Sequence, residues 1–231
     1  MGLTQSKVSK NGPTSYPGAR LNNHSEPIYA NTGVNSQQTY VPIASQVIKG
    51  SQNLTSNIHF ETLFFPDEAG LPCRNFLNNR KCNRRNCSFA HKPTSLYRFI
   101  HTLRSARSTL DICIYSLSLD DVAQEILQCH KRGVRVRVIT DSQTQENQGN
   151  DIAELRLNGV ICLEDKTEYC MHHKFCVIDG HILMNGSFNW TRAAVLGNQE
   201  NVIITNASPL VTQFQQQFEK LWKQFGTNYK H

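Results

Sequence analysis

A short run in the C-terminal half of the chain combines residue types that can act on a phosphodiester. It contains His172, His173 and Lys174, and Asp179 follows in the order H-x-K-x4-D. Side chains alternate in a β-strand, so His172 and Lys174 are expected on one face and His173 and Phe175 on the other. A nucleophilic imidazole next to a fixed ammonium group is suited to attack on phosphorus.

A second polar cluster follows the tight hairpin turn that Asp179-Gly180 predicts. The residues from Gly186 to Asn189 read G-S-x-N, and Ser187 and Asn189 can donate hydrogen bonds to the same phosphate. Glu200 opens the next apolar run, where its carboxylate can accept the imidazole N–H and orient the ring. The alternative is an ordinary β-hairpin with a polar outer face, but the joint occurrence of these motifs favours a catalytic site.

Together these motifs resemble the HKD signature of the phospholipase D superfamily, phosphodiesterases that act through a phosphohistidine. The pattern H-x-K occurs once in the chain. A single copy, accompanied by the Cys/His cluster described below, is similar to the mitochondrial cardiolipin hydrolase and Zucchini endonuclease group. The resemblance covers roughly residues 58–226 and implies an α/β/α sandwich on a mixed sheet.

The resemblance also implies a homodimer with a shared active site, because each chain supplies one histidine of this kind. His172 of one protomer would be the nucleophile, and His172 of the partner subunit the general acid that later activates water. Lys174 and the G-S-x-N donors would stabilise the phosphoryl oxygens, while Glu200 orients the imidazole. Asp179 lies at the far end of the strand and is expected to fix the hairpin rather than contact substrate. This mechanism needs no catalytic metal.

Four potential metal ligands precede this region: Cys73, Cys82, Cys87 and His91, spaced C-x8-C-x4-C-x3-H. The spacing is close to that of CCCH zinc fingers and predicts a structural, tetrahedral Zn²⁺ site. The residues between the ligands mix cations with aromatic rings, which suits single-stranded RNA or DNA. These residues are Arg74, Phe76, Arg80, Lys81, Arg84, Arg85 and Phe89. The alternative is that zinc only stabilises a loop with few apolar residues.

The composition predicts one globular domain with a polar extension. The chain has 231 residues, 39% hydrophobic content and a net charge of +6. Residues 1–56 are rich in Ser, Asn, Gln and Thr and predict a disordered tail. Residues 57–231 are expected to form the catalytic domain, with 73–91 as a zinc-binding insertion. Strands and helices alternate after residue 57, which predicts an α/β fold.

The N-terminus fits the pattern for myristoylation of Gly2. A single acyl chain binds membranes only marginally, so Lys7, Lys10 and Arg20 would add electrostatic attraction. No apolar run of transmembrane length is present. Four further cysteines lie in apolar patterns that suit reduced thiols: Cys113, Cys129, Cys162 and Cys176. We therefore expect a cytosol-facing, membrane-associated protein, and the resemblance implies the mitochondrial outer membrane.

The sequence favours single-stranded RNA over cardiolipin as the substrate. The basic insertion favours a single-stranded RNA endonuclease, which by resemblance would act in piRNA biogenesis. The alternative is hydrolysis of cardiolipin to phosphatidic acid at a mitochondrial surface. A catalytically silent binding module is disfavoured because the H-x-K-x4-D motif is intact.

Overall fold

The computed structural model describes residues 58–144 and 151–227, so Gly2, the predicted tail 1–56 and residues 145–150 lie outside the described residues. These residues form a seven-stranded sheet in the order β1-β9-β7-β6-β2-β4-β5. Its strands are β1 (Phe60–Phe65), β2 (Thr109–Ile114), β4 (Arg135–Asp141), β5 (Ile161–Asp165), β6 (Lys174–Ile178), β7 (Ile182–Gly186) and β9 (Glu200–Thr205). A separate two-stranded ribbon pairs β3 (Leu117–Ser118) with β8 (Trp190–Thr191).

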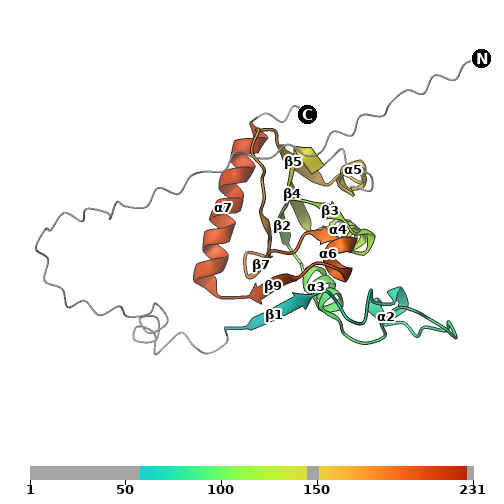
Figure 1. Ribbon diagram of the computed structural model, residues 1–231. Helices are drawn as coiled ribbons and strands as arrows, with labels where there is room; N and C mark the ends of the chain where they lie inside the picture. The colour runs from blue at the N-terminus through green and yellow to red at the C-terminus, as the bar shows by residue number, and fades with distance from the viewer. Residues whose placement is uncertain (1–57, 145–150, 228–231) are drawn as a thin grey trace, which may run out of the picture. The chain divides into compact units, whose positions relative to one another are not determined.

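Helices cover both faces of the sheet, as expected for an α/β/α sandwich (Figure 1). The long helix α7 (Ser208–Gly226) lies on one face, with Phe218 and Leu221 in the apolar cluster there. The helices α3 (Ser95–Arg104), α4 (Asp120–Lys131) and α5 (Ile152–Leu157) pack on the other face. Thr94 caps α3 by accepting a hydrogen bond from the Tyr97 N–H. The short helices are α2 (Arg74–Leu77) and α6 (Arg192–Leu196), with a 3-10 turn at Ser142–Thr144.

The sheet is mixed, and this places several strand ends at one edge. β2, β4 and β5 run parallel, whereas β6 pairs antiparallel with β2 through Ile114 and Lys174. β7 is antiparallel to β6, and β9 is antiparallel to β7. The ends of β2, β4 and β7 therefore meet the starts of β6 and β9, which brings residues distant in sequence together.

A buried ion pair explains the charges inside two of these strands. Asp111 in β2 lies opposite Arg137 in β4, and the Arg137 Nε donates to Asp111 Oδ1 at 2.8 Å. The guanidinium group also lies over the rings of Phe218 and Trp222 in α7. The pair thus fixes α7 on the sheet while satisfying both buried charges.

The Asp179 carboxylate locks the β6–β7 hairpin onto β2. Asp179 and Gly180 have φ values of 53° and 62°, the left-handed conformations of the predicted tight turn. The carboxylate accepts hydrogen bonds from the backbone N–H groups of Arg107, Ser108 and Thr109 at 2.7–3.2 Å. Burial opposes ionisation, but these hydrogen bonds prevail and lower the pKa of Asp179.

None of the described helices is long and apolar enough to cross a membrane. Four cysteines were predicted to be reduced and buried, and the structure confirms this. Cys113, Cys129, Cys162 and Cys176 are buried free thiols.

Candidate active site

His172 and Lys174 lie together at the edge where the strand ends meet. The Lys174 Nζ donates a hydrogen bond to the His172 carbonyl oxygen at 2.9 Å. The Lys174 side chain is buried, and burial lowers its pKa although Glu200 and Cys170 oppose this effect. The His172 ring is exposed. A buried cation beside an accessible imidazole can receive an anionic phosphodiester.

The prediction that one strand carries both residues is wrong in detail. β6 begins at Lys174, because β2 ends at Ile114 and offers no strand partner further on. The last contact of this ladder is the Tyr115 N–H to the His173 carbonyl at 3.0 Å. The predicted sides are nevertheless confirmed. His173 packs against the Phe175 ring at 5.4 Å, whereas His172 and Lys174 both contact the Tyr115 ring.

The segment before His172 is held by Asp141 at the end of β4. One Asp141 oxygen accepts from the Met171 N–H at 2.7 Å, and the other accepts from the Gln143 N–H at 2.9 Å. Asp141 is buried. Asp141 belongs to none of the sequence motifs, although a carboxylate at the end of a buried strand often lies at a functional site. Its contacts orient the chain that enters the H-x-K motif.

The G-S-x-N cluster follows the end of β7 and approaches the start of β9. At Gly186 an added Cβ would lie 2.0 Å from the Asn201 carbonyl oxygen, so only glycine fits. The Ser187 Oγ accepts a hydrogen bond from the Asn201 N–H at 3.1 Å. The Asn189 Oδ1 is buried and has no hydrogen-bond partner among the described residues. This oxygen is an acceptor, so a hydrogen bond from Asn189 to a phosphate oxygen would come from the Nδ2 amide.

Glu200 starts β9 at the same edge. Its carboxylate accepts a hydrogen bond from the Asn198 Nδ2 at 3.0 Å. Within the described part of the chain no hydrogen bond links Glu200 to His172, so the orienting role of Glu200 stays a prediction. Its charge raises the pKa of Lys174, which supports the ammonium form.

The predicted metal ligands come together in one cluster. One ligand atom from each of Cys73, Cys82, Cys87 and His91 lies within 4.8 Å of the others. The Phe76 N–H at the start of α2 lowers the pKa of Cys73 to about 6, which favours the thiolate that binds metal. Three thiols and one imidazole in this arrangement could hold a metal ion, and their chemistry suits zinc. All eight cysteines are free, so no disulfide competes.

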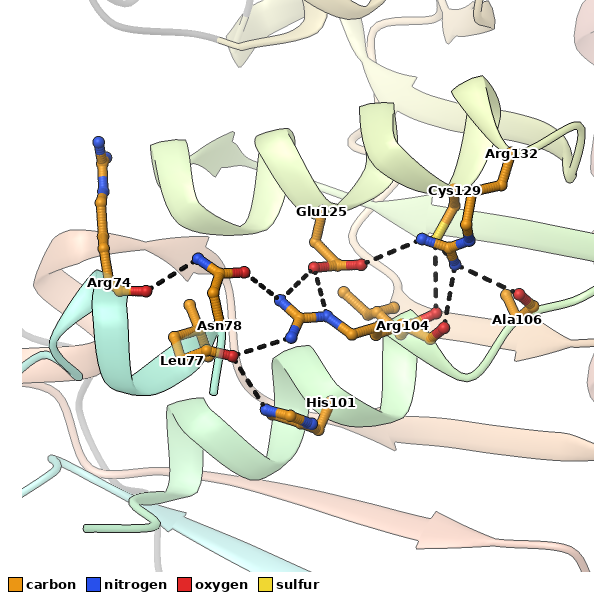
Figure 2. Close-up of polar contacts among 10 residues, drawn as sticks. Arg74, Leu77, Asn78, His101, Arg104, Ala106, Glu125, Cys129 and Arg132 are labelled. Atoms are coloured by element: carbon orange, nitrogen blue, oxygen red, sulfur yellow. Dashed lines mark hydrogen bonds and ion pairs between the residues drawn. The ribbon is translucent and has the colours of Figure 1, made fainter. Parts of the chain in front are cut away.

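A polar network ties this insertion to the body of the domain (Figure 2). The Arg104 guanidinium in α3 donates to Glu125 in α4 at 2.7 and 2.9 Å and to the Leu77 carbonyl at 2.8 Å. It also contacts the Asn78 Oδ1 at 3.2 Å. Arg132 lies on the other oxygen of Glu125 at 3.6 Å. A cation at the C-terminus of α2 is electrostatically favourable, so the network positions the insertion.

The basic residues of the insertion differ in their surroundings. Arg80, Lys81, Arg84 and Arg85 are exposed, whereas Arg74 pairs with Asp121 at 2.8 Å. Of the two aromatic residues, Phe76 packs on Tyr97 of α3, so it does not present a free ring. Phe89 is 41% exposed. It borders a cleft of about 420 Å³ whose other lining residues include Arg84, Asp121 and Arg192.

Trp190 and Tyr169, two aromatic residues close to the motifs in sequence, differ in exposure. Trp190 is buried against Phe99, with ring centroids 5.3 Å apart, and belongs to the core. Tyr169 is 76% exposed. Tyr115, which no sequence motif indicated, contacts both members of the H-x-K pair.

Comparisons with known proteins agree with this geometry. Residues 99–222 match the family model "Cardiolipin synthase, PLD-like domain". The chain is 47% identical to a Chlamydomonas reinhardtii protein over 81% of each chain, and 43% identical to a Danio rerio protein over 71% of this chain and 72% of the relative. Both relatives are named mitochondrial cardiolipin hydrolase.

Solved structures show the same fold. The phospholipase D family member Nuc from Salmonella typhimurium has a TM-score of 0.58 at 20% identity, covering 73% of this chain and 96% of Nuc. NucT from Helicobacter pylori has a TM-score of 0.56 at 22% identity, covering 72% and 97%. The sequence match to the family model and to the curated relatives carries the assignment. The chain belongs to the phospholipase D superfamily and is a hydrolase of phosphodiester bonds.

Proposed function

We propose that His172 attacks the phosphorus of a phosphodiester and forms a phosphohistidine. The P–N bond forms as the P–O bond to the leaving alkoxide breaks, and water then cleaves the P–N bond. The Lys174 ammonium neutralises the charge that develops on the non-bridging oxygens. Ser187 and Asn189 lie at the same edge and would donate to these oxygens. The observation that supports this assignment is the buried Lys174 ammonium bonded to the carbonyl of the exposed His172.

The leaving alkoxide needs a proton, and the single H-x-K motif offers no second histidine of this kind. We propose a two-fold homodimer in which His172 of the partner subunit donates that proton. The same imidazole would then accept a proton from the attacking water. Glu200 would hold the ring in the required orientation once the dimer has formed. Histidine, lysine and water supply every step, so the mechanism uses no catalytic metal.

For the substrate we propose cardiolipin, hydrolysed to phosphatidic acid. The names of the similar proteins from Chlamydomonas reinhardtii and Danio rerio support the lipid. This reverses the order expected from the sequence, in which the basic insertion placed RNA first. The relatives match over most of both chains, whereas a basic surface is compatible with any polyanion, including an anionic membrane.

Single-stranded RNA is the second candidate, and a specific observation favours it. Besides Arg74, which pairs with Asp121, the insertion presents four exposed cations, and Phe89 offers an exposed ring next to Arg84. Cations that follow a phosphate backbone and a ring on which a base can stack are typical of single-strand binding. Such an enzyme would act in piRNA processing and would also cut single-stranded DNA, because His172 replaces the ribose hydroxyl as nucleophile.

Access to a lipid substrate requires a membrane-bound enzyme. We propose that myristoylation of Gly2, assisted by the nearby basic residues Lys7, Lys10 and Arg20, brings the catalytic domain to a cytosol-facing surface. The word mitochondrial in the names of the relatives supports the mitochondrial outer membrane as that surface.

The substrate assignment is tested by offering the full chain cardiolipin vesicles and labelled single-stranded RNA in parallel. We expect release of phosphatidic acid, and its loss by at least about a thousandfold in His172→Ala, because that variant lacks the nucleophile. The matched control is His181→Ala, an exposed histidine in the hairpin turn. RNA cleavage that leaves a 5′ phosphate, without lipid turnover, would establish the second candidate instead. Full activity in His172→Ala would overturn the mechanism for either substrate.

The role of Lys174 predicts an alkaline limit to activity. Catalysis needs the ammonium form, and because burial lowers the pKa of Lys174, this form is lost at a pH below the ordinary lysine value of 10.5. Bis(4-nitrophenyl) phosphate is a suitable substrate, since its leaving group departs without a proton. We expect kcat/KM to fall on the alkaline side, and Lys174→Arg, whose side chain stays charged, to lower kcat but remove this limb. An identical limb in Lys174→Arg would contradict the assignment.

We propose that the Cys73, Cys82, Cys87 and His91 cluster binds one structural zinc ion. Cys82→Ser should then lower the zinc content measured by mass spectrometry and the Tm by roughly 5–10 °C, since a loss of about 2–3 kcal/mol shifts Tm by about 2–4 °C per kcal/mol in a domain of this size. Cys170→Ser, which changes an exposed cysteine outside the cluster, is the control and should alter neither value. Unchanged zinc content in Cys82→Ser would disprove the site.

A further inference from the structure

The aromatic ring of Tyr115 contacts both residues of the H-x-K motif. Its centroid is 4.7 Å from that of the His172 ring, with an angle of 55° between the ring planes. The Lys174 Nζ lies 5.0 Å from the same centroid, within the range of a cation–π interaction. One ring thus adjoins the imidazole and the ammonium group at the same time.

The backbone of Tyr115 is attached to the same segment. Tyr115 directly follows β2, and its N–H donates to the His173 carbonyl at 3.0 Å. This bond extends the β2–β6 ladder one step beyond the Ile114–Lys174 pair. The ring therefore starts from a rigid strand end, and its position relative to His172 and Lys174 is fixed by the sheet.

We propose that Tyr115 is a positioning residue, whose ring holds the His172 imidazole and the Lys174 ammonium in the arrangement needed for attack on phosphorus. This inference rests on the proposed function of His172 and Lys174. Without the Tyr115 ring, the exposed His172 imidazole can rotate among several rotamers, and the Lys174 ammonium loses its cation–π contact. Only part of the molecules would then be in the attacking geometry, which lowers kcat more than substrate binding.

The hydroxyl of Tyr115 has surroundings different from those of the ring face. Burial raises the pKa of Tyr115, and the neighbouring Cys170 and Asp141 raise it further, so the hydroxyl stays neutral at neutral pH. The hydroxyl hydrogen-bonds to the Cys170 side chain, whereas the contacts with His172 and Lys174 are made by the face of the ring. Phenylalanine presents the same ring face, so Tyr115→Phe should retain activity. Leucine has no ring, so Tyr115→Leu should lose activity.

The test compares Tyr115→Leu and Tyr115→Phe in the full chain, with bis(4-nitrophenyl) phosphate as the probe. We expect Tyr115→Leu to lower kcat by roughly 10- to 100-fold and to change KM by less than about twofold. Tyr115→Phe should keep kcat within about twofold of the unmodified chain. Phe60→Leu, at an exposed position of the edge strand β1, controls for the loss of an aromatic ring and should not affect kcat.

Thermal unfolding and His172→Ala separate this inference from its alternatives. A purely structural role would lower the Tm of Tyr115→Leu and reduce activity only through unfolding, whereas a positioning role lowers kcat at temperatures at which the variant is fully folded. Equal losses of kcat in the Phe and Leu variants would assign the effect to the hydroxyl and overturn the inference. If His172→Ala is inactive while Tyr115→Leu keeps full kcat, the proposed function stands and the role of Tyr115 does not.

Discussion

The site depends on the antiparallel pairing of β6 with β2 in one register. The Asp179 carboxylate fixes one end of this pairing through three backbone N–H groups that lead into β2. The Tyr115 N–H fixes the other end at the His173 carbonyl. The spacing H-x-K-x4-D is therefore the length of one short strand between two attachment points. A slip of one residue would turn every side chain of β6 to the opposite face and separate Lys174 from Tyr115.

This register explains how groups far apart in sequence meet without a dedicated catalytic loop. The mixed sheet directs the ends of β2, β4 and β7 and the starts of β6 and β9 to one edge. His172 and Lys174 lie at this edge with the G-S-x-N cluster and Glu200. Asp141 holds the segment before His172, and Gly186 allows β7 to approach β9 closely. The Cys/His insertion lies outside this sheet and is held by Arg104 and Glu125. The metal-ligand cluster and the catalytic residues are therefore positioned by different parts of the fold.

The sequence predicted the features that depend on local patterns. The α/β alternation, the turn at Asp179-Gly180 and the metal-ligand cluster all follow from spacing and residue type, and the structure contains them. It did not predict Tyr115, because contact with His172 and Lys174 arises from pairing between strands distant in the chain. His172 was expected to lie in the same strand as Lys174, but it lies just before β6, because the partner strand β2 ends at Ile114. Substrate choice depends on surfaces and membranes, which motifs do not specify.

The most direct test of the shared site uses a purified heterodimer of one unmodified chain and one His172→Ala chain. With bis(4-nitrophenyl) phosphate, the remaining His172 can attack, but no partner imidazole is present to activate water. The account predicts a burst of one 4-nitrophenolate per heterodimer, followed by arrest with a phosphorus–nitrogen bond on His172 that mass spectrometry can detect. Continued turnover at about half the rate of the unmodified dimer would mean that each protomer acts alone, and would contradict the account.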